Sequence, residues 1–139
     1  LINSIRKNER MDVIIAESSP RNILRALKNG RGVATLMDIW GGKDGRIAKL
    51  FGHQVSTPAG VAEIALRQKV PILIGFLERL KNGTHRLEDV EVIFPGDDDR
   101  LLDVDSILEY YHRRLEVAIR KKPFFWLWTH RRFKNITDY

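Results

Sequence analysis

The sequence predicts an α/β fold in which helices flank a largely parallel sheet. Apolar runs suited to buried strands alternate with amphipathic helical patterns, which is the rhythm of βαβ units. Residues 71–77 (PILIGFL) are almost continuously hydrophobic, as expected of a strand buried on both faces. A turn at residues 81–83 (KNG) then reverses the chain, so that residues 84–94 form the second strand of an antiparallel hairpin.

Local signals predict each element of the N-terminal part of the chain. Residues 1–5 begin an amphipathic helix, and residues 12–16 (DVIIA) form a short apolar strand. The pair Ser19-Pro20 marks the start of a helix, because serine is a favoured N-cap and proline a favoured first residue. Gly30 ends that helix, and residues 32–37 (GVATLM) predict the next strand.

The elements that follow are predicted in the same way. Residues 38–50 are rich in glycine and predict a loop, and Thr57 is expected to cap a helix that runs to Lys69. An acidic linker at residues 97–99 leads into a long helix at about residues 103–121. Apolar side chains at helical spacing give this helix a buried stripe: Val104, Ile107, Leu108, Tyr111, Leu115, Ala118 and Ile119.

Composition limits the possible classes of protein. At 139 residues the chain is one domain at most, and it contains no cysteine, which excludes disulfides and thiolate metal sites. The net charge of +6 favours an anionic partner such as a phosphorylated lipid, an acidic protein or a nucleic acid. No apolar run is long enough to span a bilayer, and there is no signal-peptide pattern. The start at Leu1, without an initiator methionine, predicts a fragment.

The C-terminal segment, residues 123–134 (PFFWLWTHRRFK), combines four aromatic rings at its start with a cationic cluster at its end. Rings beside cations suit a surface where hydrocarbon meets anionic head groups. The same composition suits phosphates with stacked bases. The structural alternative is a terminal helix whose rings close the core and whose basic end is solvated. The residues alone leave these alternatives open.

A search for self-contained catalytic motifs finds none. There is no G-x-S-x-G nucleophile elbow, and Gly42-Lys43 lacks the upstream glycine of a phosphate-binding loop. The four histidines are scattered without the spacing of metal ligands, so no metal site is predicted.

The pattern W-x-H-R-R-F-K at residues 128–134 resembles the C-terminal signature of the bacterial lipid A biosynthesis acyltransferases, the lauroyl and myristoyl transferases of the lysophospholipid acyltransferase superfamily. Shorter pieces in the same order strengthen this resemblance. They are residues 22–30 (the L-L-x-x-L-x-x-G helix), Met37-Asp38 (P-D), residues 50–52 (F-F-G), residues 57–60 (T-x-x-G) and residues 71–79 (V-P-x-F-x-x-R).

The resemblance implies an enzyme that moves a fatty acyl chain from acyl carrier protein to a hydroxyl of a lipid A precursor. The reaction would occur at the cytoplasmic face of the bacterial inner membrane, without a metal or organic cofactor. The superfamily uses a histidine base with a carboxylate five residues later, but here the residues five beyond each histidine are Pro58, Val90, Val117 and Asn135. Residues 1–139 are therefore expected to be the C-terminal part of a single acyltransferase domain, without catalytic residues and inactive alone.

Five residues are predicted to bind substrate: Asp38, Arg79, His130, Arg131 and Arg132. The expected partners are the acyl carrier protein thioester, a phosphorylated glycolipid acceptor and the membrane surface, with no nucleic acid. For four of these residues a structural alternative stays open, namely loop capping for Asp38, a plain ion pair for Arg79 and a solvated helix end for Arg131 and Arg132. The alternative function is a basic, non-catalytic module that binds nucleic acid or an anionic surface.

Overall fold

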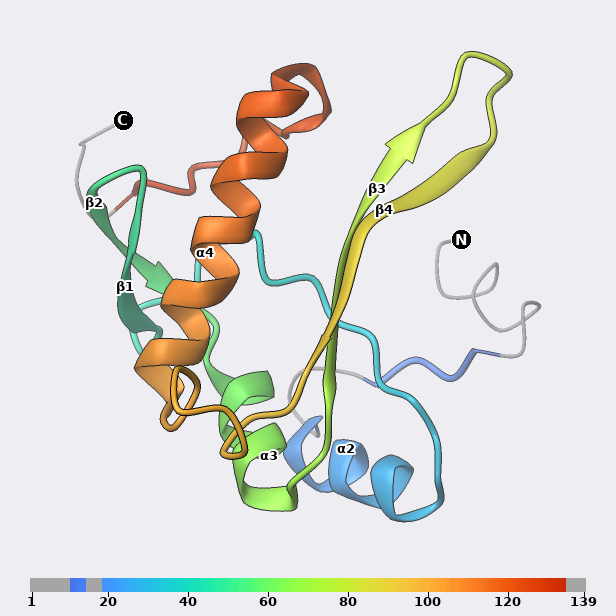
Figure 1. Cartoon of the computed structure of the whole chain (residues 1–139), viewed down its shortest axis with the longest axis vertical. Coiled ribbons are helices and arrows are strands. Elements are labelled where there is room, and N and C mark those ends of the chain that lie inside the picture. The colour runs from blue at the N-terminus through green and yellow to red at the C-terminus, as the bar shows by residue number, and fades with distance from the viewer. Residues whose placement is uncertain (1–10, 15–18, 135–139) are drawn as a thin grey trace. The chain divides into compact units, whose positions relative to one another are not determined.

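The computed structural model describes residues 11–14 and 19–134, in two compact units, residues 1–35 and 36–139 (Figure 1). The described part of the first unit contains one helix, α2 (Ser19–Lys28). Its cationic side chains are exposed, and Gly30 ends the turn that follows with a φ of 69°. The predicted helix and its glycine stop are thus confirmed. The predicted helix at residues 1–5 lies outside the described residues.

Neither strand predicted in this region is found. Residues 12–14 and 32–37 form no strand, and residues 15–16 lie outside the described part of the chain. Most of residues 31–36 are exposed to solvent, with Leu36 at 70%. An apolar run becomes a strand only when a partner strand satisfies its backbone groups, and the described structure pairs none with these residues.

The second unit begins with a hairpin where a loop was predicted. Strand β1 (Arg46–Leu50) pairs antiparallel with β2 (His53–Thr57), and Leu50 lies opposite His53. The two connecting residues, Phe51 and Gly52, have φ values of 51° and 80°. A two-residue turn with both φ values positive matches the right-handed twist of the strands that it joins.

Helix α3 (Gly60–Gln68) packs Ala62 and Ala65 into the core. Its N-cap is Ala59, with no side-chain hydrogen bond, so the predicted capping role of Thr57 is wrong. Thr57 is instead the last residue of β2, and it is fully buried.

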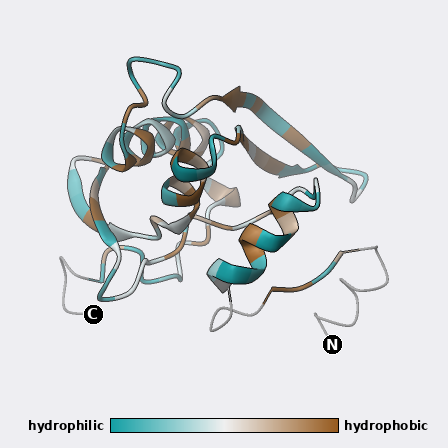
Figure 2. Cartoon of the chain, turned by 90° about the horizontal axis from the view of Figure 1, so that it is seen from below, coloured by the Kyte–Doolittle hydropathy of each residue, from teal (hydrophilic) through white to brown (hydrophobic). Residues whose placement is uncertain are grey.

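The largest sheet is a second hairpin, in which β3 (Ile72–Arg79) pairs antiparallel with β4 (His85–Ile93). The prediction of a largely parallel sheet is therefore wrong, because the described strands form two separate antiparallel pairs. Residues 72–79 are not buried on both faces either. Ile74 faces the core, whereas Leu73 and Leu77 on the opposite face are 59% and 67% exposed. In Figure 2 the two strands carry hydrophobic stretches, and their connecting turn is hydrophilic.

Helix α4 (Val104–Lys121) lies between the two hairpins (Figure 1). Asp103 is its N-cap in a capping box with Ser106, whose backbone N–H donates to the Asp103 carboxylate at 2.8 Å. The helix contributes Ile107 and Leu108 to one core cluster, with Ile74 and Ile93 of the long hairpin. A second cluster joins it to the short hairpin through Leu50, Val55, Leu115 and Ile119. Among the described helices, none is long and apolar enough to cross a membrane.

Candidate functional site

The C-terminal segment follows α4 and does not continue it as a helix. A short 3-10 helix, η2 (Pro123–Phe125), is followed by tight turns in which His130 N–H donates to the Leu127 carbonyl at 3.0 Å. The indole Nε1–H of Trp128 donates to the Pro123 carbonyl at 2.7 Å and closes this part of the segment into a loop. The alternative of a terminal helix is therefore wrong.

Arg132 is buried to 1% exposure at the end of β2. Its Nη1 donates to the Ser56 carbonyl, and its Nη2 donates to Thr57 Oγ1 at 2.9 Å and to His112 Nε2 at 3.1 Å. Burial lowers the pKa of Arg132, and the nearby Tyr111 and Asp38 oppose that shift. The guanidinium thus fastens the C-terminal segment to β2 and α4.

His112 is the partner of Arg132 on α4, and it is 1% exposed. Its Nδ1 lies 2.8 Å from the Lys49 carbonyl oxygen, which can only accept, so the ring proton is assigned to Nδ1. Nε2 is then the acceptor from Arg132. Burial lowers the pKa of His112 to about 4, so the imidazole is neutral at pH 7. Figure 1 shows α4 running beside the short hairpin, whose β1 strand supplies this carbonyl.

The loop before β1 also contacts the C-terminal segment. The backbone N–H of Trp40 donates to His130 Nε2 at 2.9 Å, and Lys134 Nζ lies 4.6 Å from the centre of the Trp40 ring. Gly41 passes so close to β2 that an added Cβ would lie 2.5 Å from the Thr57 carbonyl carbon. This glycine is therefore required for the approach of the loop to β2.

Asp38 and His130 line the same small hollow, with Ile39, Trp126 and Leu127. Its volume of about 20 Å³ accommodates a single water molecule and no substrate group. A larger hollow of about 380 Å³ lies at the end of β4, lined by Glu91, Val92, Ile93, Phe94, Asp97, Asp98 and Arg100. It is bordered mainly by carboxylates and apolar groups, which disfavours a phosphate there, and none of the five predicted residues lines it.

Arg79 lies apart from the other predicted residues, at the end of β3 far along the long hairpin (Figure 1). It is exposed and pairs across the strands with His85. Within residues 11–14 and 19–134 its guanidinium makes no hydrogen bond or ion pair. The structure therefore brings Asp38, His130 and Arg132 together and leaves Arg79 elsewhere. Arg131 is exposed beside Arg132. The substrate-binding roles of all five stay predictions.

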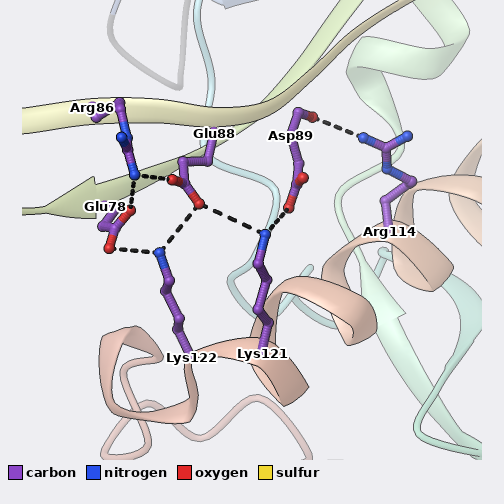
Figure 3. A network of polar contacts seen from close by, with 7 residues as sticks. All are labelled: Glu78, Arg86, Glu88, Asp89, Arg114, Lys121 and Lys122. Atoms are coloured by element: carbon purple, nitrogen blue, oxygen red, sulfur yellow. Dashed lines mark hydrogen bonds and ion pairs between the residues drawn. The ribbon is translucent and has the colours of Figure 1, made fainter.

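A charged network holds the long hairpin to the C-terminal end of α4 (Figure 3). Lys122 Nζ lies 2.5 Å from Glu78 and 3.2 Å from Glu88, and Arg86 bridges the same two carboxylates. The hydrogen bond from Lys122 is the main cause that lowers the pKa of Glu78 to about 2. The negative charges of Glu78 and Glu88 are thus balanced by cations of the same chain. Glu78 lies on the face of β3 opposite to that of Arg79.

Sequence reasoning missed His112, Thr57 and Trp40. The signal for His112 was present, because it lies four residues after Leu108 and three before Leu115, within the apolar stripe of α4. A histidine at such a position is buried and needs partners for both ring nitrogens. Thr57 and Trp40 had no comparable signal, because their contacts join segments far apart in the sequence. No group of three or more potential metal ligands is found among the described residues.

Comparison with protein families gives one match that covers nearly the whole chain. The model described as bacterial lipid A biosynthesis acyltransferase matches residues 1–135. The comparison with curated individual proteins returned no match.

Proposed function

Because the chain belongs to the bacterial lipid A biosynthesis acyltransferase family, we propose that it contributes to the transfer of a fatty acyl chain from acyl carrier protein to a hydroxyl of a lipid A precursor. The family membership identifies an acyltransferase of lipid A biosynthesis. The thioester donor, the phosphorylated glycolipid acceptor and the setting at the cytoplasmic face of the inner membrane are parts of the proposal. The match over residues 1–135 is the single observation that carries it.

The proposed division of labour follows from the residues that are present. Acyl transfer to a hydroxyl needs a general base near neutral pKa, and a carboxylate that holds the base in one tautomer. No histidine in residues 1–139 has a carboxylate five positions later, so we assign the base to a partner segment that carries the His-x4-Glu motif. His112 is not a substitute, because its pKa of about 4 makes it a weak base and both of its ring nitrogens are occupied.

The acceptor carries phosphates, and the chain has a net charge of +6. Of the predicted cationic side chains, Arg132 is already engaged inside the protein, whereas Arg79 is exposed at the edge of an apolar face that includes Leu77 and Leu87. An exposed arginine beside apolar side chains suits an amphiphilic ligand, since the planar guanidinium can bind a phosphate with two parallel hydrogen bonds. We assign Arg79 to the acceptor phosphate.

This assignment is tested in a grafted enzyme, in which residues 1–139 replace the matching part of an active family member that keeps its His-x4-Glu motif. Arg79→Ala is expected to raise the KM for the phosphorylated acceptor roughly tenfold with little change in kcat, because a hydrogen bond to a charged group contributes about 1.5–3 kcal/mol. The melting temperature is expected to stay within a few degrees, because the side chain is exposed.

Lys81→Ala is the matched control, because it removes an exposed cation from the turn of the same hairpin. Its KM is expected to change less than about twofold, as for a surface charge without a specific partner. If Arg79→Ala and the unmodified graft had equal KM values, Arg79 would have no role in binding the substrate. Equal increases for both variants would mean that bulk charge, and not a specific phosphate contact, is responsible.

A further inference from the structure

The loop closed by Trp128 exposes large apolar side chains to solvent. Within five consecutive residues, Phe124 is 75% exposed, Phe125 41%, Leu127 65% and Trp128 62%. Single exposed apolar residues are normal, but a contiguous group of this kind marks an interaction surface. We call residues 124–128 the aromatic loop.

The fold holds the aromatic loop in this exposed arrangement. Trp126 points the other way and packs against the core cluster that contains Leu115 and Ile119. At the end of the segment Arg132 is fastened to β2 and α4, so both ends of the loop are anchored. The loop therefore cannot bury its own rings without breaking these contacts.

The indole N–H of Trp128 already has a hydrogen-bond acceptor within the protein, which suits the ring to an apolar environment. Its only N–H donates to the Pro123 carbonyl at 2.7 Å. A buried donor without a partner costs about 1–3 kcal/mol, but a donor that is already satisfied can enter hydrocarbon without that cost. The rings of Phe124 and Phe125 lie against one another at an angle of 52°, with their centres 4.6 Å apart, and they carry no polar group at all.

The charge around the aromatic loop indicates the sign of its partner. Residues 117–134 contain no carboxylate and six cations: Arg120, Lys121, Lys122, Arg131, Arg132 and Lys134. Lys121 and Lys122 face the carboxylates of the long hairpin, and Arg132 is buried. Arg131 and Lys134, which follow the loop in the sequence, are exposed. Apolar rings followed by exposed cations complement a surface whose interior is hydrocarbon and whose boundary is anionic.

We propose that the aromatic loop binds the surface of an anionic phospholipid bilayer, with Phe124, Leu127 and Trp128 at the boundary between head groups and acyl chains. Arg131 and Lys134 would lie at the level of the phosphates. This deepens the proposed function, on which it rests for the membrane as the place of reaction. It assigns a binding role to side chains that neither the fold nor the acyl transfer accounts for.

The test is sedimentation of the purified chain with vesicles of phosphatidylglycerol and phosphatidylethanolamine, compared with vesicles of phosphatidylcholine alone. The double variant Phe124→Ser/Leu127→Ser leaves the Trp128–Pro123 hydrogen bond and the backbone hydrogen bonds of the loop in place, because neither side chain takes part in them. Its binding to the anionic vesicles is expected to be roughly twentyfold weaker, because two large exposed apolar groups no longer enter the boundary region. Binding of the unmodified chain is expected to weaken with salt and to be weaker on phosphatidylcholine.

The matched control is Ile47→Ser/Leu102→Ser, which removes two side chains of 52% and 59% exposure, one on β1 and one shortly before α4. Its vesicle binding is expected to stay within about twofold of the unmodified chain, since neither residue belongs to the aromatic loop. Equal losses in both variants would overturn the proposal in favour of unspecific apolar adsorption. Loss in the control alone would overturn it as well, because the membrane surface would then lie at Ile47 and Leu102.

Two further results would also overturn the proposal. One is equal binding to anionic and neutral vesicles, and the other is salt-sensitive binding to single-stranded nucleic acid with no vesicle binding. The measurement uses no acyl donor and no acceptor. A grafted enzyme without turnover would therefore contradict the proposed function and leave the vesicle result unaffected, and the reverse holds as well.

Discussion

Arg132→Ala is expected to lower the free energy of unfolding by about 4 kcal/mol, a large part of the stability of a domain of this size. The substitution removes the buried donor to the Thr57 hydroxyl and to His112 Nε2 and opens a cavity between β2 and α4. Arg132→Lys keeps the charge but not the planar fork, so it is expected to lose most of the same free energy. Urea denaturation, read from the transition midpoint at constant slope, measures the change.

The neighbouring Arg131 provides the control for this measurement, because it is exposed and carries the same charge. Arg131→Ala is expected to change the free energy of unfolding by no more than about 0.5 kcal/mol. If Arg132→Ala changed the free energy of unfolding as little as Arg131→Ala, Arg132 would not hold the C-terminal segment against β2 and α4. The structural account of the H-R-R pattern would then be wrong.

The second large effect is a loss of stability in mild acid. His112 has a pKa of about 4 in the folded protein and an ordinary value of 6.5, so on acidification the unfolded chain takes up this proton first. The stability that neutral His112 confers is fully present above pH 6.5 and is lost as the pH falls towards 4. The shift corresponds to about 3 kcal/mol of unfolding free energy over that window.

Urea denaturation at a series of pH values measures this dependence. His112→Asn is expected to be less stable at pH 7 but to show a flatter profile between pH 6.5 and 4, because the titrating group is gone. His85→Asn, at an exposed position of the long hairpin, is expected to keep the unmodified profile. Parallel profiles for the unmodified chain and His112→Asn would contradict a buried, neutral His112.

The helices and the antiparallel hairpin of residues 71–94 could be predicted from the sequence, whereas the short hairpin and the absence of a parallel sheet could not. Helix α4 has a capping residue, an apolar stripe and a basic last turn, and it was found almost to the residue. The run at residues 71–77 does form a strand, but periodicity does not say whether one face or two are covered. Leu73 and Leu77 lie on an exposed face, so the step from a continuous apolar run to a parallel sheet failed.

The short hairpin was missed for a different reason. Its turn places Phe51 at a φ of 51°, where glycine or asparagine is the usual signal, so no turn motif was visible. The glycines before β1 predicted a loop, and Gly41 indeed lies in one, but its purpose is the close approach to Thr57. Such an approach is a property of the folded arrangement and leaves no local pattern.

For the candidate site, the family resemblance singled out the C-terminal segment but did not predict the contacts that its residues make inside the protein. Arg132 and His130 were predicted as substrate residues, and both make internal contacts, with β2 and α4 and with the loop before β1, respectively. A short motif does not distinguish a binding residue from one that fastens the segment in place. The exposures of Phe124 and Trp128 likewise emerge only when the turns after α4 are known.

Acyl transfer by the grafted enzyme tests the central claim most directly. Residues 1–139 alone and the graft with its His-x4-Glu segment are each incubated with acyl carrier protein thioester and a lipid A precursor, and the acceptor is analysed by mass spectrometry. We predict an acceptor heavier by one acyl group with the graft and an unchanged acceptor with residues 1–139 alone. Two results would contradict the account. One is an unchanged acceptor with a graft that circular dichroism shows to be folded, and the other is an acylated acceptor with residues 1–139 alone.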